Sequence, residues 1–200
     1  MSARDGVYSV KMGYHRRKAR SSVNVNRAGL SNVIPSSCWN MIWKISVIPR
    51  VQQFIWKLLS SAVATNVALM RRKRAKHSKC PVCENADETI EHVFFHCSWT
   101  RCIWFGCSLS VRMEASRVTN FKRWWMETSD STLLNKQDLA LICWLLWYIW
   151  KARNEMLFNQ KQPNPGTVIE LAQRSHFEFK TIGATKVVDH LQSRGCDSPG

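Results

Sequence analysis

Apolar residues recur at helical spacing through much of the chain, and the clearest stripe follows Pro49. Its members lie at i, i+3, i+4, i+7, i+8 and i+11, so they share one face of a helix. They are Val51, Phe54, Ile55, Leu58, Leu59 and Ala62. Pro49 suits the first turn of this helix, because an N–H group there has no intrahelical partner to lose. A second helix is expected directly before it, from the spacing of Trp39, Ile42, Trp43 and Ile45.

Capping residues and local apolar spacing predict shorter helices in the middle of the chain. Three of these helices follow an N-cap whose side-chain oxygen can accept a hydrogen bond from the first free N–H groups. The N-caps are Thr65, Thr89 and Ser98. We expect the first helix to end near Leu69 and the third at Gly106. Residues 107–117 are expected to form a loop, and a further helix contains Phe121, Trp124 and Trp125.

A long helix is predicted from about Asn135 to Asn159. Its inner face is expected to carry Leu139, Ile142, Leu146, Trp147 and Trp150. The apolar run in this helix is about half the roughly 20 residues that a membrane-spanning helix needs, so it indicates a buried helix. The helix is expected to end at Pro163, Pro165 and Gly166.

A last amphipathic helix is predicted to follow these prolines. Thr167, with Glu170 three residues later, matches a capping box, and the helix should continue to about Lys180. Its apolar face is expected to include Val168, Leu171, Ala172 and Phe179. The last fifteen residues are expected to fray.

The N-terminal part has a different pattern. Residues 5–14, DGVYSVKMGY, begin with an Asp-Gly turn signal and then alternate, which predicts a short strand. Residues 19–37 are rich in Ser, Asn and Arg and have no sustained period, which indicates a flexible connection. The fold class is therefore mainly α: a small helical metal-binding module with a short N-terminal strand, followed by a longer helical extension. The expected divisions are a basic arm at 1–37, the module at 38–107, the extension at 108–180 and a flexible tail at 181–200.

The charge of the chain adds a candidate partner. Lys and Arg number 29 against 14 Asp and Glu, a net charge of +15, which is typical of proteins that contact phosphate backbones. A cluster of basic residues directly precedes Cys80 and comprises Arg71, Arg72, Lys73, Arg74, Lys76 and Lys79. This basic cluster predicts contact with RNA or DNA, or a nuclear import signal. A solvated helix end is the alternative interpretation.

Eight cysteines would suit a disulfide framework in a secreted protein, but the first residues, MSARD, lack the apolar core of a secretory signal. An intracellular location is therefore predicted, the nucleus included, with no membrane partner. In a reducing compartment a CxxC pair indicates metal or redox chemistry. Redox pairs begin a helix within a βαβ unit, and the pattern contains no such unit. Metal binding is the favoured interpretation.

The segment 80–97 reads CPVCENADETIEHVFFHC, which is C-x2-C-x8-H-x4-C. Three thiolates and one imidazole are a complete tetrahedral set for Zn²⁺. We therefore predict Cys80, Cys83, His92 and Cys97 as the ligands. His96 stays open as an alternative to His92, which we favour because adjacent side chains such as those of His96 and Cys97 rarely reach one ion without strain.

The environment of this site argues against catalysis. Catalytic zinc usually keeps three protein ligands and one water, whereas this set supplies four ligands. The order Glu91-His92-x3-His96 also differs from the H-E-x-x-H pattern of metalloproteases. Glu91 or Glu88 is expected to orient the imidazole by hydrogen bonding to it. The chain is therefore predicted not to be an enzyme.

Several blocks of sequence carry a family resemblance. In order they are DGVYSVKMGY, WNMIWKISVIPRVQQFIWKLL, Thr65 with Leu69, CPVC, and EHVFFHC with Trp104. Together, over about residues 5–107, they resemble the reverse-transcriptase zinc-binding domain family, which is common in non-LTR retrotransposons of plants. The resemblance implies that the four predicted ligands bind zinc. In that family the domain follows a reverse transcriptase and often precedes a ribonuclease H domain. Neither activity is expected here, because the chain carries neither set of acidic motifs.

Two functions remain open at this point. The first is a non-catalytic zinc-binding module of retrotransposon origin that binds RNA or DNA without sequence preference through the basic cluster. The second is a protein-interaction scaffold, or an inactive retroelement remnant, in which zinc is purely structural. The ten tryptophans can in principle stack on bases, although core packing is the favoured role for most of them.

Overall fold

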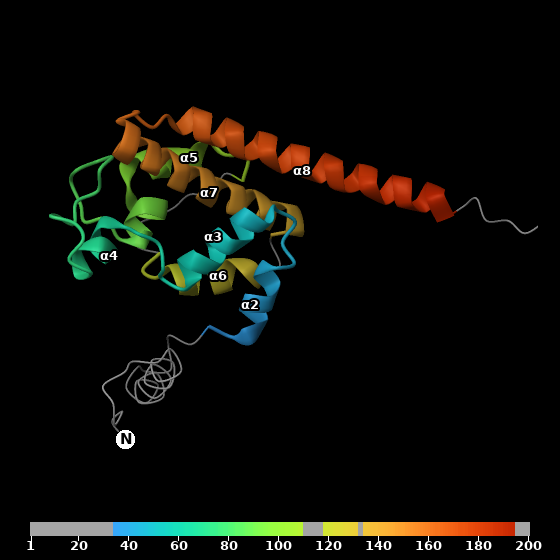
Figure 1. The fold of residues 1–200 in the computed structure, drawn as a ribbon, viewed down its shortest axis with the longest axis horizontal. Coiled ribbons are helices and arrows are strands. Elements are labelled where there is room, and N and C mark those ends of the chain that lie inside the picture. Colours follow the sequence, from blue (N-terminus) through green and yellow to red (C-terminus); the bar gives the residue numbers. More distant parts are fainter. Residues whose placement is uncertain (1–33, 110–117, 132–133, 195–200) are drawn as a thin grey trace, which may run out of the picture. The chain divides into compact units, whose positions relative to one another are not determined.

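Helices form the regular structure of the part of the chain that the computed structural model describes, residues 34–109, 118–131 and 134–194 (Figure 1). They are α2 (Ser36–Ile42), α3 (Pro49–Leu59), α4 (Asn66–Arg71), the π-helix η2 (His92–His96), α5 (Ser98–Gly106), α6 (Phe121–Ser129), α7 (Lys136–Asn159) and α8 (Pro165–Arg194). The mainly helical fold class is confirmed. The strand expected at 5–14 lies outside the described residues, as does nearly all of the basic arm.

The first helix is shorter than its apolar spacing predicts. α2 ends at Ile42, and Trp43 is 51% exposed in the turn that follows. Two features of the chain explain the early end. The Gln52 amide donates to the carbonyl oxygens of Trp43 and Ile45, and Ile48 is extended, as the residue before a proline tends to be.

The stripe that follows Pro49 is confirmed as the buried face of α3. Pro49 lies in the first turn, and Val51, Ile55, Leu58 and Leu59 are fully or almost fully buried. Ala62 is the exception, because α3 ends at Leu59. The left-handed Ser61, at φ 53°, turns the chain away, so Ala62 is exposed and Val63 is buried in its place.

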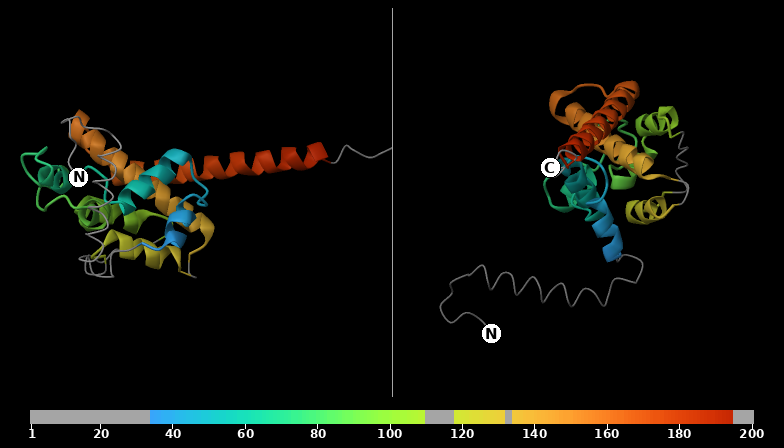
Figure 2. Two further views of the ribbon diagram at one scale, coloured as in Figure 1. Left: turned by 60° about the horizontal axis from the view of Figure 1, so that its bottom comes forward. Right: turned by 90° about the vertical axis from the view of Figure 1, so that its right-hand side faces the viewer.

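α7 and α8 run side by side in all three views (Figures 1 and 2). α7 occupies the predicted range and begins with a capping box formed by Asn135 and Asp138. It ends at Asn159, where Gln160 is left-handed, before the prolines are reached. No helix among residues 34–109, 118–131 and 134–194 is both long and apolar enough to cross a membrane.

α8 differs from its predicted range at both ends. It begins at Pro165, since the side chain of Asn164 accepts the hydrogen bond from the N–H of Thr167 and so occupies the capping role expected of Thr167. It continues to Arg194 rather than ending near Lys180. Val168 and Ala172 on its predicted apolar face are buried.

The core is centred on aromatic side chains of η2, α5 and α6. Phe94, Phe95, Trp104 and Trp125 are fully buried, and the Trp125 ring packs against that of Phe121. The Trp104 indole N–H donates to the carbonyl oxygen of Phe94 at 2.6 Å, which ties α5 to η2. Core packing is thus confirmed for these two tryptophans. Ser98 is not the N-cap of α5: Cys97 holds that position, and Ser98 is the first helical residue.

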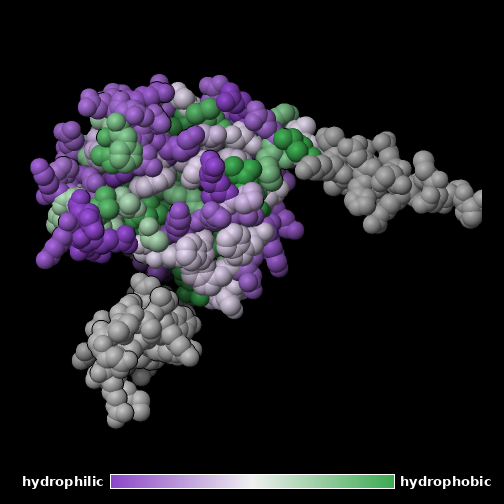
Figure 3. Space-filling model, viewed as in Figure 1, coloured by the Kyte–Doolittle hydropathy of each residue, from purple (hydrophilic) through white to green (hydrophobic). Residues whose placement is uncertain are grey.

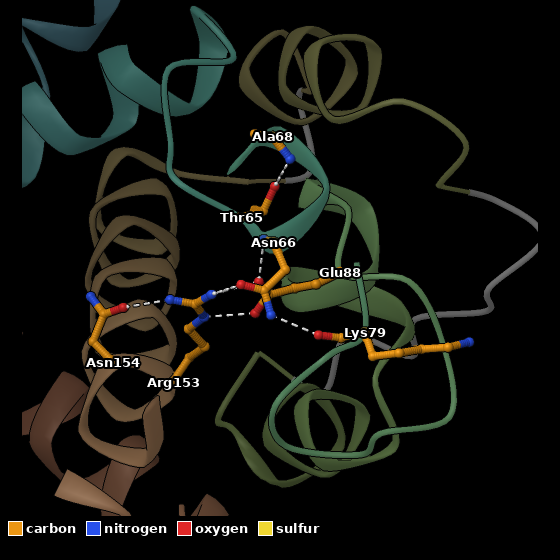
Figure 4. Close-up of polar contacts among 7 residues, drawn as sticks. All are labelled: Thr65, Asn66, Ala68, Lys79, Glu88, Arg153 and Asn154. Atoms are coloured by element: carbon orange, nitrogen blue, oxygen red, sulfur yellow. Dashed lines mark hydrogen bonds and ion pairs between the residues drawn. The ribbon is translucent and has the colours of Figure 1, made fainter. Parts of the chain in front are cut away.

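A buried polar network joins the C-terminal half of α7 to the segment around α4 (Figure 4). The Arg153 guanidinium donates to both carboxylate oxygens of Glu88, from Nε at 2.6 Å and from Nη2 at 2.5 Å. Glu88 also accepts from the backbone N–H of Asn66 at 2.6 Å. The Asn66 amide donates in turn to the carbonyl oxygen of Lys79 at 2.7 Å. The network therefore holds three segments together that are distant in sequence.

The network leads to a prediction about stability. Glu88 is fully buried and Arg153 is 2% exposed, so Arg153→Met leaves an uncompensated buried carboxylate. Removing one partner of a buried ion pair typically costs about 3–5 kcal/mol. We expect that loss in the free energy of unfolding, measured by urea denaturation.

The matched control is Arg123→Met, which breaks the exposed ion pair of Arg123 with Glu127 in α6. It should leave the urea midpoint unchanged, because exposed pairs are screened by water. Equal effects of the two substitutions would contradict a structural role for the buried network.

Candidate metal centre

A tight loop brings Cys80 and Cys83 together. Lys79 and Asp87 form an isolated antiparallel bridge at its base. Inside the loop, the N–H of Cys80 donates to the carbonyl oxygen of Ala86, and the N–H of Glu84 donates to that of Cys80, both at 2.9 Å. Glu84 is left-handed at φ 58°, which closes the turn after the CxxC pair.

The other half of the site is carried by η2. Thr89 accepts from the backbone N–H of His92 at 3.0 Å, which confirms its predicted capping role. The helix that follows is a π-turn rather than an α-turn, and the N–H of Cys97 donates to the carbonyl oxygen of His92 at 2.8 Å. In an α-helix, residues five apart point about 140° away from each other. The wider i→i+5 turn lets His92 and Cys97 face the same point.

Four ligand atoms converge at this point. The sulfurs of Cys80, Cys83 and Cys97 and one ring nitrogen of His92 all lie within 4.8 Å of one another. The Cys83 sulfur lies 3.3 Å from Nε2 of His92. A tetrahedral ion with Zn–S bonds of about 2.3 Å requires sulfurs about 3.8 Å apart. The donor set and its spacing fit a tetrahedral metal ion that prefers thiolate and imidazole ligands.

Burial and a mutual hydrogen bond shift the pKa values of two cysteines of the cluster in opposite directions. Cys80, Cys97 and His92 are buried. A hydrogen bond with the Cys97 side chain lowers the pKa of the Cys80 thiol to about 3, against the opposing effect of burial. The same bond, together with burial, raises the pKa of the Cys97 thiol. A coordinating cation removes both protons outright, because it binds thiolates.

The structure separates the two histidines. Nε2 of His96 lies 2.9 Å from the carbonyl oxygen of Val118, so His96 points away from the cluster, and His92 is the histidine that joins the three cysteines. The expectation that Glu91 or Glu88 orients the imidazole is wrong. Glu91 accepts from the backbone N–H of Phe121, and Glu88 is engaged by Arg153.

The comparisons with known proteins agree with this geometry. The family model described as zinc-binding in reverse transcriptase matches residues 8–104, which include all four converging side chains. Residues 8–104, just under half of the chain, are therefore similar to this zinc-binding family. A relative from Arabidopsis thaliana, named "Putative ribonuclease H protein", is 24% identical over 164 residues, or 79% of this chain. The chain spans 24% of the length of that curated relative. No solved structure matches this chain.

The basic cluster of this zinc-binding domain lies on the surface beside the metal centre. All six members are exposed, and hydrophilic side chains, with some hydrophobic ones between them, lie along the side of the molecule on which α4 lies (Figure 3). Arg71 ends α4, and Lys73 is left-handed at φ 55°. Lys79 is the member with an ion pair to another described residue, at 3.8 Å from Asp87.

Sequence reasoning missed the residues of the buried polar network, which hold in place the segment that carries the basic cluster. Asn66, Glu88 and Arg153 are buried although their types are usually exposed. One signal was present: Arg153 lies four residues after Ile149, on the buried face of the long apolar helix. A charge on such a face needs a buried partner.

The two histidines give a direct test of the metal centre. We expect His92→Ala to lose bound zinc after dialysis against a weak chelator, because three ligands remain. His96→Ala should retain the zinc of the unmodified chain, since its imidazole contacts Val118. Metal analysis per mole of protein measures both. Loss of zinc from the His96 variant alone would overturn the assignment.

Proposed function

We propose that the chain is a non-catalytic zinc-binding module of retrotransposon origin that binds RNA or DNA through its basic cluster. In this proposal Zn²⁺ is held by Cys80, Cys83, His92 and Cys97. The convergence of these four side chains is the observation that carries the proposal. When bound, the ion supplies structural cross-linking between the loop and η2. Four protein ligands leave no open coordination position, which supports a role without catalysis.

The buried network links the metal centre to the basic cluster. The bond from the Asn66 amide to Lys79 joins the start of α4 to the residue before Cys80. The basic cluster lies on the segment between these two residues, which is therefore closed at its base. A fixed base lowers the entropy lost when such a segment binds a ligand.

The charges of the basic cluster suit a phosphate backbone. Arg71, Arg72, Lys73, Arg74 and Lys76 are exposed and have no ion pair with any residue of the described ranges. Exposed cations without an ion-pair partner can displace the counterions of a nucleic acid, and this displacement supplies most of the non-specific affinity. Such contacts act on the backbone and therefore distinguish poorly between sequences.

Salt dependence tests the proposal. We expect the observed affinity for RNA or DNA to fall linearly on a plot of log K against log salt. Each lost phosphate contact changes that slope by about 0.7–0.9. Arg71→Gln/Arg72→Gln/Lys73→Gln should therefore flatten it by about 2–3, as measured by fluorescence anisotropy.

The control for this experiment removes equal charge elsewhere. Lys136, Arg174 and Lys180 are exposed on α7 and α8, and changing all three to Gln should alter the slope far less. If the two triple variants bind alike, the basic cluster is not the binding surface. A protein partner captured without any salt-dependent binding of nucleic acid would favour the scaffold role instead.

A further inference from the structure

A groove of about 370 Å³ lies between α3, α7 and the loop that joins α3 to α4. It is separate from the metal ligands and the basic cluster, neither of which lines it. α3 contributes Arg50 and Lys57, and α7 contributes Trp147, Trp150 and Lys151. The volume is within the range of about 300–1,000 Å³ that is usual for ligand sites.

The charged residues that line the groove are all basic. Arg50, Lys57 and Lys151 are all exposed, and no Asp or Glu lines the groove. None of the three forms an ion pair with another residue that the structure describes. Arg50 and Lys57 lie two helical turns apart, about 10 Å along the axis of α3. They can therefore contact different phosphates of one strand.

Neighbouring side chains hold the two tryptophans of the groove in place. Trp147 and Trp150 are half-buried. Phe54 packs against both of them, with ring centroids 5.3 Å away from Trp147 and 6.2 Å away from Trp150. Arg153 lies over the ring of Trp150 at 4.9 Å, so Trp147 is the ring with fewer neighbours. Fixed aromatic rings provide stacking surface at low entropic cost.

We propose that this groove binds a single-stranded segment of nucleic acid, with a base against Trp147 and phosphates at Arg50, Lys57 and Lys151. Stacking on an aromatic ring beside backbone-binding cations is the general chemistry of single-strand recognition. The inference rests on the proposed function in that the chain binds nucleic acid. It goes further because it predicts contact with the bases and a preference for unpaired strands, which the basic cluster alone does not provide.

The experiment compares a dye-labelled oligothymidylate with an oligonucleotide of equal length that contains abasic sites throughout. Both strands carry the same phosphates, so only base contacts distinguish them. The unmodified chain should bind the strand with bases about tenfold more tightly, because stacking contributes strongly per base. Trp147→Leu should reduce this ratio to near unity. Equal affinity of the unmodified chain for the two strands would overturn the proposal.

A charge variant keeps the test independent of the core. Arg50→Gln/Lys57→Gln/Lys151→Gln changes exposed side chains only, and it should lose at least tenfold more affinity for the oligothymidylate than the Lys136/Arg174/Lys180 control. This comparison decides the matter if Trp147→Leu fails to fold. Equal losses in the two triple variants would overturn the groove proposal. Binding of an acidic peptide that no oligonucleotide displaces would also overturn it.

The two proposals fail in different ways. The Arg71/Arg72/Lys73 variant can lose salt-dependent binding while the groove variants match their control. That result would support the basic cluster as the binding surface and overturn the groove proposal. If the groove variants lose binding and the basic-cluster variant does not, the groove stands as the binding surface. If the unmodified chain binds neither strand, the groove proposal is wrong, and if it also binds no duplex RNA or DNA, both proposals are wrong.

Discussion

The convergence of four side chains on one point is the constraint on which the rest of the molecule depends. The three sulfurs and the His92 nitrogen lie within 4.8 Å of one another, and three thiolates this close repel one another unless a cation neutralises their charge. The local backbone is arranged to allow it. A left-handed Glu84 closes the loop, and a π-turn replaces the α-turn between His92 and Cys97.

The polar network carries this constraint beyond the metal centre. Glu88 lies between the CxxC loop and η2, and its carboxylate is bonded to Arg153 in α7 and to Asn66 at the start of α4. The helical extension and the metal-binding segment are therefore joined through a buried ion pair as well as through the aromatic core. The basic cluster begins at the end of α4, so its position is fixed relative to both the helical extension and the metal-binding segment.

The fold could be predicted where one periodic pattern decides the structure. The stripe of α3, the cap at Thr89 and the C-x2-C-x8-H-x4-C spacing each depend on neighbouring residues alone. The Glu88–Arg153 pair spans 65 residues, so helical spacing places Arg153 on the buried face of α7 but nothing local identifies Glu88 as its partner. Other errors arose from competition between nearby signals: Asn164 before Pro165 caps α8 in place of Thr167. The bond of His96 to Val118 was likewise not visible in the spacing.

Zinc content of the purified full chain, measured together with hydrogen exchange before and after chelation, is the most direct test of a structural metal centre. One zinc per chain is expected, with none in Cys80→Ser. Chelation should speed amide exchange around residues 80–105, because coordination is coupled to folding. A metal-free chain with the same slow exchange in this segment would contradict the structural role of zinc.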